Sequence, residues 1–282
     1  MMYANNRLLA MVEGNTVPLG MQCFTADHTF LEVLGRTGFD FVMLDTEHCG
    51  TNPRALEDSI RAADGAGLVA IVRVPEAEDG AAIRRALEAG AQGLIVPMVK
   101  SAADLRKVLD AALFPPAGKR GMCPAVRAAD YSYRTFGQYA EWNNANVLVI
   151  PLIEHPDAVE SIDEICAVEQ VRIITFGAND FAYAAGEGTQ GISSPTVQAG
   201  YRRVRDAAKR HGVALMAGSV AGPTVTSCAT ALDDGVRMFC IGLDVMGFRA
   251  LCEDAIRALN TAVVGSTFSR PAAPESAFSD VR

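Results

Sequence analysis

Residues 41–48 read Phe-Val-Met-Leu-Asp-Thr-Glu-His, an apolar run that ends in polar side chains able to bind a metal or move a proton. The same arrangement recurs where residues 69–72 meet Arg73 and where residues 147–153 meet Glu154. Short, nearly continuous apolar runs are typical of buried parallel strands. Because the reactive groups of a (β/α)8 barrel gather at the carboxyl ends of its strands, this pattern predicts such a barrel with a site at that rim.

Eight strand-like runs alternate with stretches of helical periodicity along the chain. They lie near residues 19–23, 41–45, 69–73, 94–97, 147–153, 171–176, 213–216 and 238–241. Residues 53–65 form an amphipathic helical pattern, which Asn52 can cap. This alternation predicts an α/β fold in which a parallel sheet closes into a (β/α)8 TIM barrel. A doubly wound open sheet is the competing topology, and the lack of a glycine-rich fingerprint after the first strand disfavours it.

The domain limits follow from length and composition. Residues 1–264 are predicted to form one barrel domain, because such barrels commonly take about 250 residues. Within them, residues 1–14 are expected to form a short helix over the bottom of the barrel. Residues 265–282, in which Ser, Pro and Ala are prominent, are expected to be a disordered tail. Residues 114–140 are too long for an ordinary connection, which suggests a lid or an interface element.

Composition excludes several classes of partner. The net charge of −8 is spread along the chain without a basic stripe, so neither nucleic acid nor an anionic membrane surface is expected to bind. No apolar run approaches the roughly 18 residues of a membrane span, and the start of the chain has no signal-peptide core. Seven scattered cysteines without a CxxC pair favour reduced thiols and a cytoplasmic location over disulfides.

Two carboxylates follow successive strands and are the best metal candidates. Glu154 and Asp180 offer the oxygen ligands that Mg²⁺ or Mn²⁺ prefers, with the remaining positions left to water or substrate. Each can instead cap the helix that follows it, but two carboxylates at neighbouring strand ends favour the metal site. Backbone N–H groups in the turn before Asp180 can also bind a carboxylate. That turn consists of Gly177, Ala178 and Asn179.

The other polar side chains at strand ends suit substrate binding and proton transfer. Arg73 directly follows an apolar strand, and its forked guanidinium matches the two oxygens of a carboxylate. A structural ion pair with Asp45 or Glu47 is the alternative. His48 lies three residues after Asp45, and a nearby carboxylate can hold one ring nitrogen and make the other more basic. His48 is therefore predicted to be the general base.

These motifs resemble those of a known enzyme family. The segment Gly38–His48, GFDFVMLDTEH, is similar to the GFDxxxxDxEH signature of the HpcH/HpaI aldolase family, the metal-dependent class II pyruvate aldolases. Other segments agree with this family in order and spacing. They are Val72–Pro75, Gly90–Val99, Phe114–Gly121, Ile153–Glu154, Gly177–Asp180 and Ile241–Asp244.

The resemblance implies a barrel of the phosphoenolpyruvate/pyruvate type and assigns roles by motif position. Glu154 and Asp180 would hold the divalent metal ion, which is Mg²⁺, Mn²⁺ or Co²⁺. Arg73 would bind the carboxylate or carbonyl region of pyruvate. His48, paired with Asp45, would act as the base or through an activated water. A further residue, Glu47, would organise the metal-bound waters.

The family pattern also implies an assembly, and this chain departs from the pattern at two positions. Members are usually hexamers with the last helix exchanged between neighbours, so we expect a homo-oligomer, either a trimer or a hexamer. Leu152 stands where many members carry Gln, which removes a polar contact near the substrate. Glu88 stands where members often carry Asp, at a position that can reach a neighbouring subunit's site.

The predicted function is that of an aldehyde-lyase. The enzyme would cleave a 4-hydroxy-2-oxo acid to pyruvate, or a close 2-oxo acid, and an aldehyde through a metal-stabilised enolate. The alternative is a CoA-ester lyase of the citrate-lyase β type, or an oxaloacetate-using synthase or decarboxylase on the same barrel. A catalytically silent scaffold is disfavoured because the metal and base motifs are intact.

Overall fold

The computed structural model describes residues 5–14, 16–133, 135–188, 193–220, 224–264 and 267. The chain divides into two compact units, Met1–Asp244 and Val245–Arg282. Helix α12 (Asp244–Val263) falls in the second unit apart from its first residue, and the predicted barrel domain 1–264 stays a prediction. The predicted disordered tail, 265–282, lies outside the described residues except for Thr267.

The first unit contains a closed barrel of eight parallel strands. They are β1 (Leu19–Cys23), β2 (Phe41–Asp45), β3 (Val69–Arg73), β4 (Gly93–Val96), β5 (Leu148–Ile153), β6 (Ile173–Phe176), β7 (Ala214–Val220) and β8 (Val236–Leu243). Each strand pairs in parallel with the next, and β8 pairs with β1. The predicted (β/α)8 TIM barrel is confirmed, and the open-sheet alternative is wrong.

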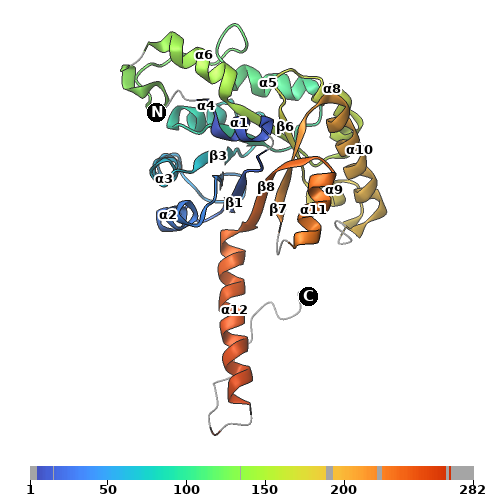
Figure 1. Cartoon of the computed structure of the whole chain (residues 1–282). Helices are drawn as coiled ribbons and strands as arrows, with labels where there is room; N and C mark the ends of the chain where they lie inside the picture. Colours follow the sequence, from blue (N-terminus) through green and yellow to red (C-terminus); the bar gives the residue numbers. More distant parts are fainter. Residues whose placement is uncertain are drawn as a thin grey trace. The chain divides into compact units, whose positions relative to one another are not determined.

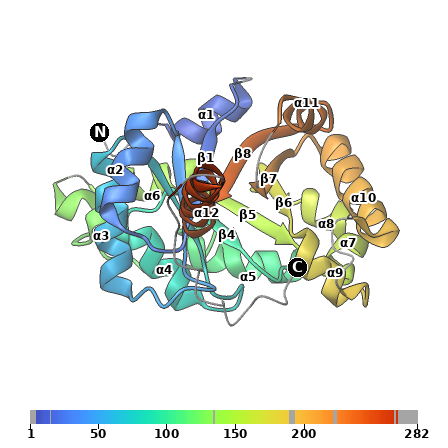
Figure 2. The same ribbon diagram turned by 90° about the horizontal axis from the view of Figure 1, so that it is seen from below.

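In the first unit, one helix precedes β1, and the others connect the strands and lie outside them (Figure 1, Figure 2). They are α1 (Arg7–Glu13), α2 (His28–Thr37), α3 (Pro53–Gly65), α4 (Gly80–Ala89), α5 (Ala102–Ala112), the 3-10 helix η1 (Arg127–Ser132), α6 (Phe136–Asn146), α7 (Pro156–Glu160), α8 (Ile162–Cys166), α9 (Ala178–Ala184), α10 (Pro195–His211) and α11 (Val225–Asp233). Asn52 caps α3, as its sequence predicted. Among the described helices, none has the length and apolar character needed to cross a membrane.

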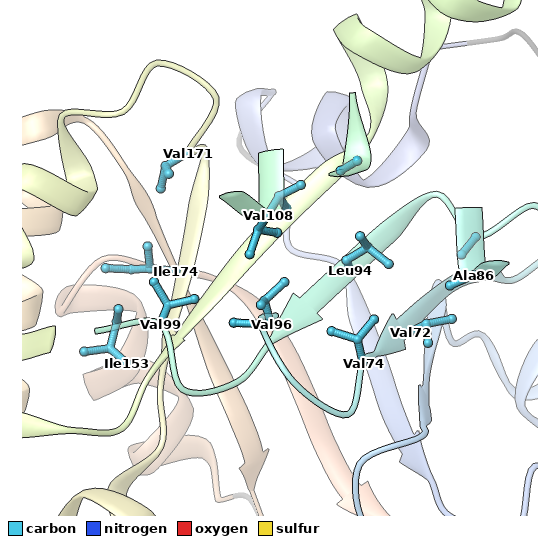
Figure 3. Packing of buried hydrophobic residues seen from close by; sticks show 14 of the residues in the cluster. Val72, Val74, Ala86, Leu94, Val96, Val99, Val108, Ile153, Val171 and Ile174 are labelled. Carbon is cyan, nitrogen blue, oxygen red and sulfur yellow. The ribbon is translucent and has the colours of Figure 1, made fainter. Parts of the chain in front are cut away.

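Strand residues alternate between the barrel interior and the layer beneath the helices. In β2, Phe41 and Met43 belong to the interior cluster, whereas Val42 and Leu44 belong to the outer one. Figure 3 shows part of the outer cluster, in which strand and helix residues meet, among them Val72, Leu94, Ala86 and Val108. Asp45, the next inward position of β2, therefore turns into the mouth of the barrel.

Helix α1 closes the amino ends of the strands, as the sequence predicted. Asn6 caps this helix and also donates from Nδ2 to the backbone oxygens of Gln92 and Asn146, which precede β4 and β5. Leu8 is completely buried in the interior cluster. One polar residue thus fixes the helix, and one apolar residue fills the bottom of the barrel.

The long segment after α5 is anchored by a buried arginine. Arg120 donates from Nη1 to Asn143 Oδ1 at 2.8 Å and from Nη2 to the Tyr139 hydroxyl at 3.0 Å. Its guanidinium also lies 4.6 Å from the centre of the Phe114 ring, a cation–π distance. The segment contains η1 and is packed against the barrel unit at its base, while its predicted role as a lid or interface element stays a prediction.

The plug formed by Leu8 can be tested by truncation. We expect Leu8→Ala to lower the free energy of unfolding by about 2–5 kcal/mol, because it leaves a cavity inside the barrel. Leu9→Ala should lower it less, since that side chain is only half-buried. Urea denaturation followed by circular dichroism measures both values, and equal losses would contradict the role assigned to Leu8.

Candidate active site

Polar side chains occupy the inward positions where β1, β2 and β3 end. Asp45 and Arg73 are direct partners in the β2–β3 register. Gln22 of β1 is the partner of Met43, one inward position below Asp45. Strand alternation therefore turns three polar side chains from consecutive strands into the same mouth.

Asp45 is the centre of this group and is 1% exposed. Its Oδ1 accepts from the backbone N–H groups of Glu47 at 2.8 Å and His48 at 3.0 Å. Its Oδ2 accepts from Gln22 Nε2 at 2.8 Å and from Arg73 Nη2. Burial alone would raise the pKa of Asp45, but the Arg73 guanidinium and the other donors outweigh it and hold that pKa below its usual value. Asp45 is thus a charged anchor.

Arg73 joins the two carboxylates of the β2 motif. Besides Asp45, it meets Glu47, whose Oε2 lies 3.1 Å from Nη1. The ion pairs considered as the structural alternative are therefore present. Two buried atoms nevertheless make no hydrogen bond among the described residues, Nε of Arg73 and Oε2 of Glu47. An N–H donor that stays unpaired in a largely buried arginine is available to an anionic ligand.

The imidazole ring of His48 lies beside a different carboxylate from the one predicted. Asp45 contacts its backbone N–H and not its ring. The ring is 56% exposed, and its Nε2 lies 3.6 Å from Glu47 Oε2. The predicted ring contact with Asp45 is therefore corrected: the carboxylate beside the imidazole is Glu47. The difference arises because the backbone N–H groups of Glu47 and His48 turn back to Asp45 Oδ1, while the side chain of His48 is largely exposed.

Glu154 lies just beyond β5 and is 4% exposed. Its Oε1 accepts from the backbone N–H of Met98 at 2.8 Å. Burial, followed by repulsion from Asp180 and Glu47, raises the pKa of Glu154 to about 7 despite that hydrogen bond. Glu154 does not cap the next helix, because the N-cap residue of α7 is His155, whose side chain accepts from the Asp157 N–H.

Asp180 lies in the first turn of α9 and is exposed. The N-cap of this helix is Gly177, which has no side chain to cap it, so the cap alternative for Asp180 does not apply either. Its negative charge is near enough to raise the pKa of both Glu154 and Glu47, for which burial is the larger cause. Successive strands therefore bring the two predicted metal carboxylates near enough to affect each other electrostatically.

Gly177 permits the close approach of Glu154. A Cβ at this position would meet Glu154 Cβ at 2.8 Å and its Oε2 at 2.9 Å. Its N–H donates to Ile153 O at 3.0 Å, so it is unavailable to a ligand. The predicted backbone carboxylate site is corrected on this point and reduces to Ala178 and Asn179 in the first turn of α9.

The charge balance of the mouth suits a divalent cation. Glu154 and Asp180 repel each other, and Glu154 has one backbone donor to offset its burial. Within the described ranges, no three His, Cys, Asp or Glu side chains are grouped as a metal site. The two predicted ligands, Glu154 and Asp180, would be a set that suits an oxygen-preferring ion whose other ligands are water or substrate. The residues present fit the metal that the family pattern implies.

Glu88 lies apart from this cluster, on α4. It acts electrostatically on Arg120 and Tyr139, at the base of the long segment. Its predicted role toward a neighbouring subunit's site stays a prediction.

Two residues of the site were missed by sequence reasoning. Gln22 could have been found, because it is a polar residue at an inward position of an otherwise apolar strand. Met98 could not have been found, because it contributes a backbone N–H. Its positive φ of 55° is a conformation that a methionine in the sequence does not predict.

Comparisons with known proteins agree with the fold and indicate the family. Residues 19–250 match the model of the HpcH/HpaI aldolase/citrate lyase family. The 5-keto-4-deoxy-D-glucarate aldolase of Klebsiella pneumoniae subsp. pneumoniae is 29% identical over 245 residues, which are 87% of this chain and 93% of that protein. The HpcH/HpaI aldolase from Desulfitobacterium hafniense DCB-2 has a TM-score of 0.83 and 25% identity, covering 91% of this chain and 97% of that one. Citrate synthase SbnG has a TM-score of 0.79 and 26% identity, covering 90% and 98%.

The backbone at Met98 can be tested independently of activity. Met98→Gly should raise the free energy of unfolding by up to about 1 kcal/mol, because glycine adopts a positive φ without a Cβ penalty. Met98→Ala keeps that penalty and is the matched control, since the native side chain is 45% exposed and contributes little packing. If urea denaturation gave the two variants equal stability, the backbone at residue 98 would not be strained.

Proposed function

Because the chain belongs to the HpcH/HpaI aldolase/citrate lyase family and is an enzyme of the aldolase and lyase type, we propose that it cleaves a 4-hydroxy-2-oxo acid to an aldehyde and pyruvate, or a close 2-oxo acid. One observation carries the proposal. Arg73 has a buried Nε–H without a hydrogen bond among the described residues, and its charge acts on Glu154, as does that of Asp180. An arginine beside a cation-binding carboxylate pair matches the carboxylate and the 2-oxo oxygen of such a substrate.

Arg73 binds the substrate and orients it. Asp45 and Glu47 fix two of its terminal nitrogens, and the remaining Nε–H donates to an oxygen of the 2-oxo acid. Because the guanidinium is largely buried, this charge-assisted hydrogen bond is stronger than one in water. Binding therefore satisfies a donor that the protein leaves unpaired.

Glu154 and Asp180 would hold the divalent ion, which we propose to be Mg²⁺, Mn²⁺ or Co²⁺. When bound, such an ion stabilises negative charge on the 2-oxo oxygen as the enolate develops. Gly177 leaves room for the Glu154 carboxylate, and the Met98 N–H fixes one of its oxygens. Glu47 orders water beside the pair.

His48 accepts the proton of the substrate's C4 hydroxyl as the C3–C4 bond breaks. Its ring lies at the open side of the mouth, where the aldehyde must leave. Glu47, at 3.6 Å, stabilises the positive charge that the imidazole gains. The two electrons of the broken bond stay on C3 and form the enolate, which a proton then converts to pyruvate.

A second candidate function follows from the likeness to citrate synthase SbnG. This candidate is a CoA-ester lyase of the citrate-lyase β type, or an oxaloacetate-using synthase or decarboxylase. The apolar Leu152, packed beside Gly177 at the inner wall, is a departure from the aldolase pattern that favours testing oxaloacetate as well as aldol substrates.

We propose that the enzyme works in the cytoplasm as a homo-oligomer, a trimer or a hexamer with α12 exchanged between subunits. Helix α12 carries exposed apolar side chains at helical spacing, namely Val245, Phe248, Ile256 and Leu259. Such a face suits burial in a partner subunit. The free thiols of all seven cysteines support a reducing compartment.

Metal removal tests the proposed function. Exhaustive chelation should abolish both oxaloacetate turnover and aldol addition of pyruvate to a panel of aldehydes, and Mn²⁺, Co²⁺ or Mg²⁺ should restore them. Glu154→Gln, which keeps the volume but removes the charge, should also lower Mn²⁺ affinity measured by calorimetry. Full activity of the chelated enzyme would refute the proposed chemistry.

The base is tested by a separate variant. His48→Ala should lower the rate of aldol cleavage by about 10²–10⁴-fold, because proton transfer then falls to water. Metal affinity should change little. His211→Ala is the matched control, since its ring also lies beside a carboxylate, at 3.0 Å from Asp163 Oδ1, but on α10. Unchanged cleavage by the His48 variant would assign the base elsewhere.

A further inference from the structure

Gln22 is a buried amide at the inner wall of the mouth and is 5% exposed. Its Nε2 donates to Asp45 Oδ2 at 2.8 Å, across the β1–β2 pair. Met43 is its neighbour on β2, and Phe41 lies one inward position deeper, so apolar side chains fill the barrel interior beside and below it. Burying an amide among apolar side chains costs free energy unless the amide is hydrogen-bonded. Packing alone therefore does not explain a glutamine at this position, and its bond to the Asp45 carboxylate suggests another role.

The two oxygens of Asp45 have different kinds of partner. Oδ1 is held by backbone N–H groups, which cannot move without moving the chain. Oδ2 is held by two side chains, Gln22 and Arg73, which can move. The orientation of the carboxylate about its Oδ1 contacts therefore depends on this second pair of donors.

A ligand changes the balance between these donors. When a 2-oxo acid accepts from the Nε–H of Arg73, the positive charge of the guanidinium is shared between the ligand and Asp45, which is bound through Nη2. Asp45 is buried, so a weakened bond to Arg73 must be offset by another donor at Oδ2. Gln22 is that donor: its Nε2 already donates to Asp45 Oδ2, and this bond stays in place when the guanidinium of Arg73 engages a ligand.

We propose that Gln22 is a positioning residue: its amide holds Asp45, and through Asp45 the guanidinium of Arg73, in the orientation that receives a 2-oxo acid. This inference rests on the proposed function. Gln22 does not touch the reacting atoms; it lowers the free-energy cost of engaging Arg73. Its loss should therefore weaken ground-state binding more than it slows chemistry.

The experiment uses the full chain with Mn²⁺ and compares Gln22→Met with the unaltered protein. Methionine keeps the length and volume of the side chain and removes the donor. The dissociation constant of pyruvate, by calorimetry, and the KM of oxaloacetate should rise by about 10- to 100-fold, the loss of one hydrogen bond to a charged group. The kcat should change less. Gln22→Asn keeps an amide on a shorter stem and should fall between the two.

The matched control is an amide bound to a buried charge elsewhere. Asn143 Oδ1 accepts from Arg120 Nη1 at the same distance, 2.8 Å, in the long segment. Asn143→Leu should lower the melting temperature and leave pyruvate binding unchanged. A common loss of affinity in both variants would show that Gln22 acts only through general stability.

A double-mutant cycle with Asp45→Asn isolates the proposed route. In that background Gln22→Met should have little further effect on pyruvate binding, and an undiminished effect would overturn the inference. If the unaltered protein binds pyruvate and Gln22→Met binds it equally well, the inference also fails. If the unaltered protein neither binds pyruvate nor turns over oxaloacetate, it is the proposed function that fails.

Discussion

The buried ion pair between Asp45 and Arg73 is the constraint on which the mouth of the barrel depends. Neither charge is stable there alone, and breaking such a pair from one side typically costs about 3–5 kcal/mol. Strand register sets the pair, because the two residues are direct partners at the ends of β2 and β3. Neighbouring side chains add to the pair: Gln22 donates to Asp45, and Glu47 forms an ion pair with Arg73, whose Nε stays without a hydrogen bond.

The same mouth gives its carboxylates opposite properties. Asp45 receives four donors, and its pKa stays below the usual value despite burial. Glu154 has one donor and acidic neighbours, and its pKa is raised to about 7. A cation can stabilise Glu154, because this carboxylate is buried, accepts one hydrogen bond and feels the negative charge of Asp180. Asp45 is already paired with the cationic Arg73. The difference between Asp45 and the proposed metal ligand Glu154 follows from their donors and not from residue type.

Much of this could be read from the sequence because strand alternation and strand ends are local properties. They placed Asp45, Arg73 and Glu154 at one rim, and the closed barrel confirms the reason they converge. The contacts themselves could not be read in the same way. Whether Asp45 meets the ring or the backbone of His48 depends on the turn after β2, and the Met98 N–H reaches Glu154 across 56 positions of sequence. Such contacts depend on tertiary packing, which the local pattern does not record.

The polar groups that hold α1 at the bottom of the barrel differ from those at the mouth in how fully they are satisfied. At the bottom, Asn6 caps α1 and donates to two strand-leading carbonyls, and Leu8 fills the space above it. At the mouth, Arg73 and Glu47 each leave a buried atom without a hydrogen bond, and Met98 holds a positive φ. Strain and unpaired groups persist only where the surroundings impose them, and a ligand can satisfy them. The unpaired donor of Arg73 and the unpaired acceptor of Glu47 are the groups that the proposed 2-oxo acid and the ordered water would satisfy.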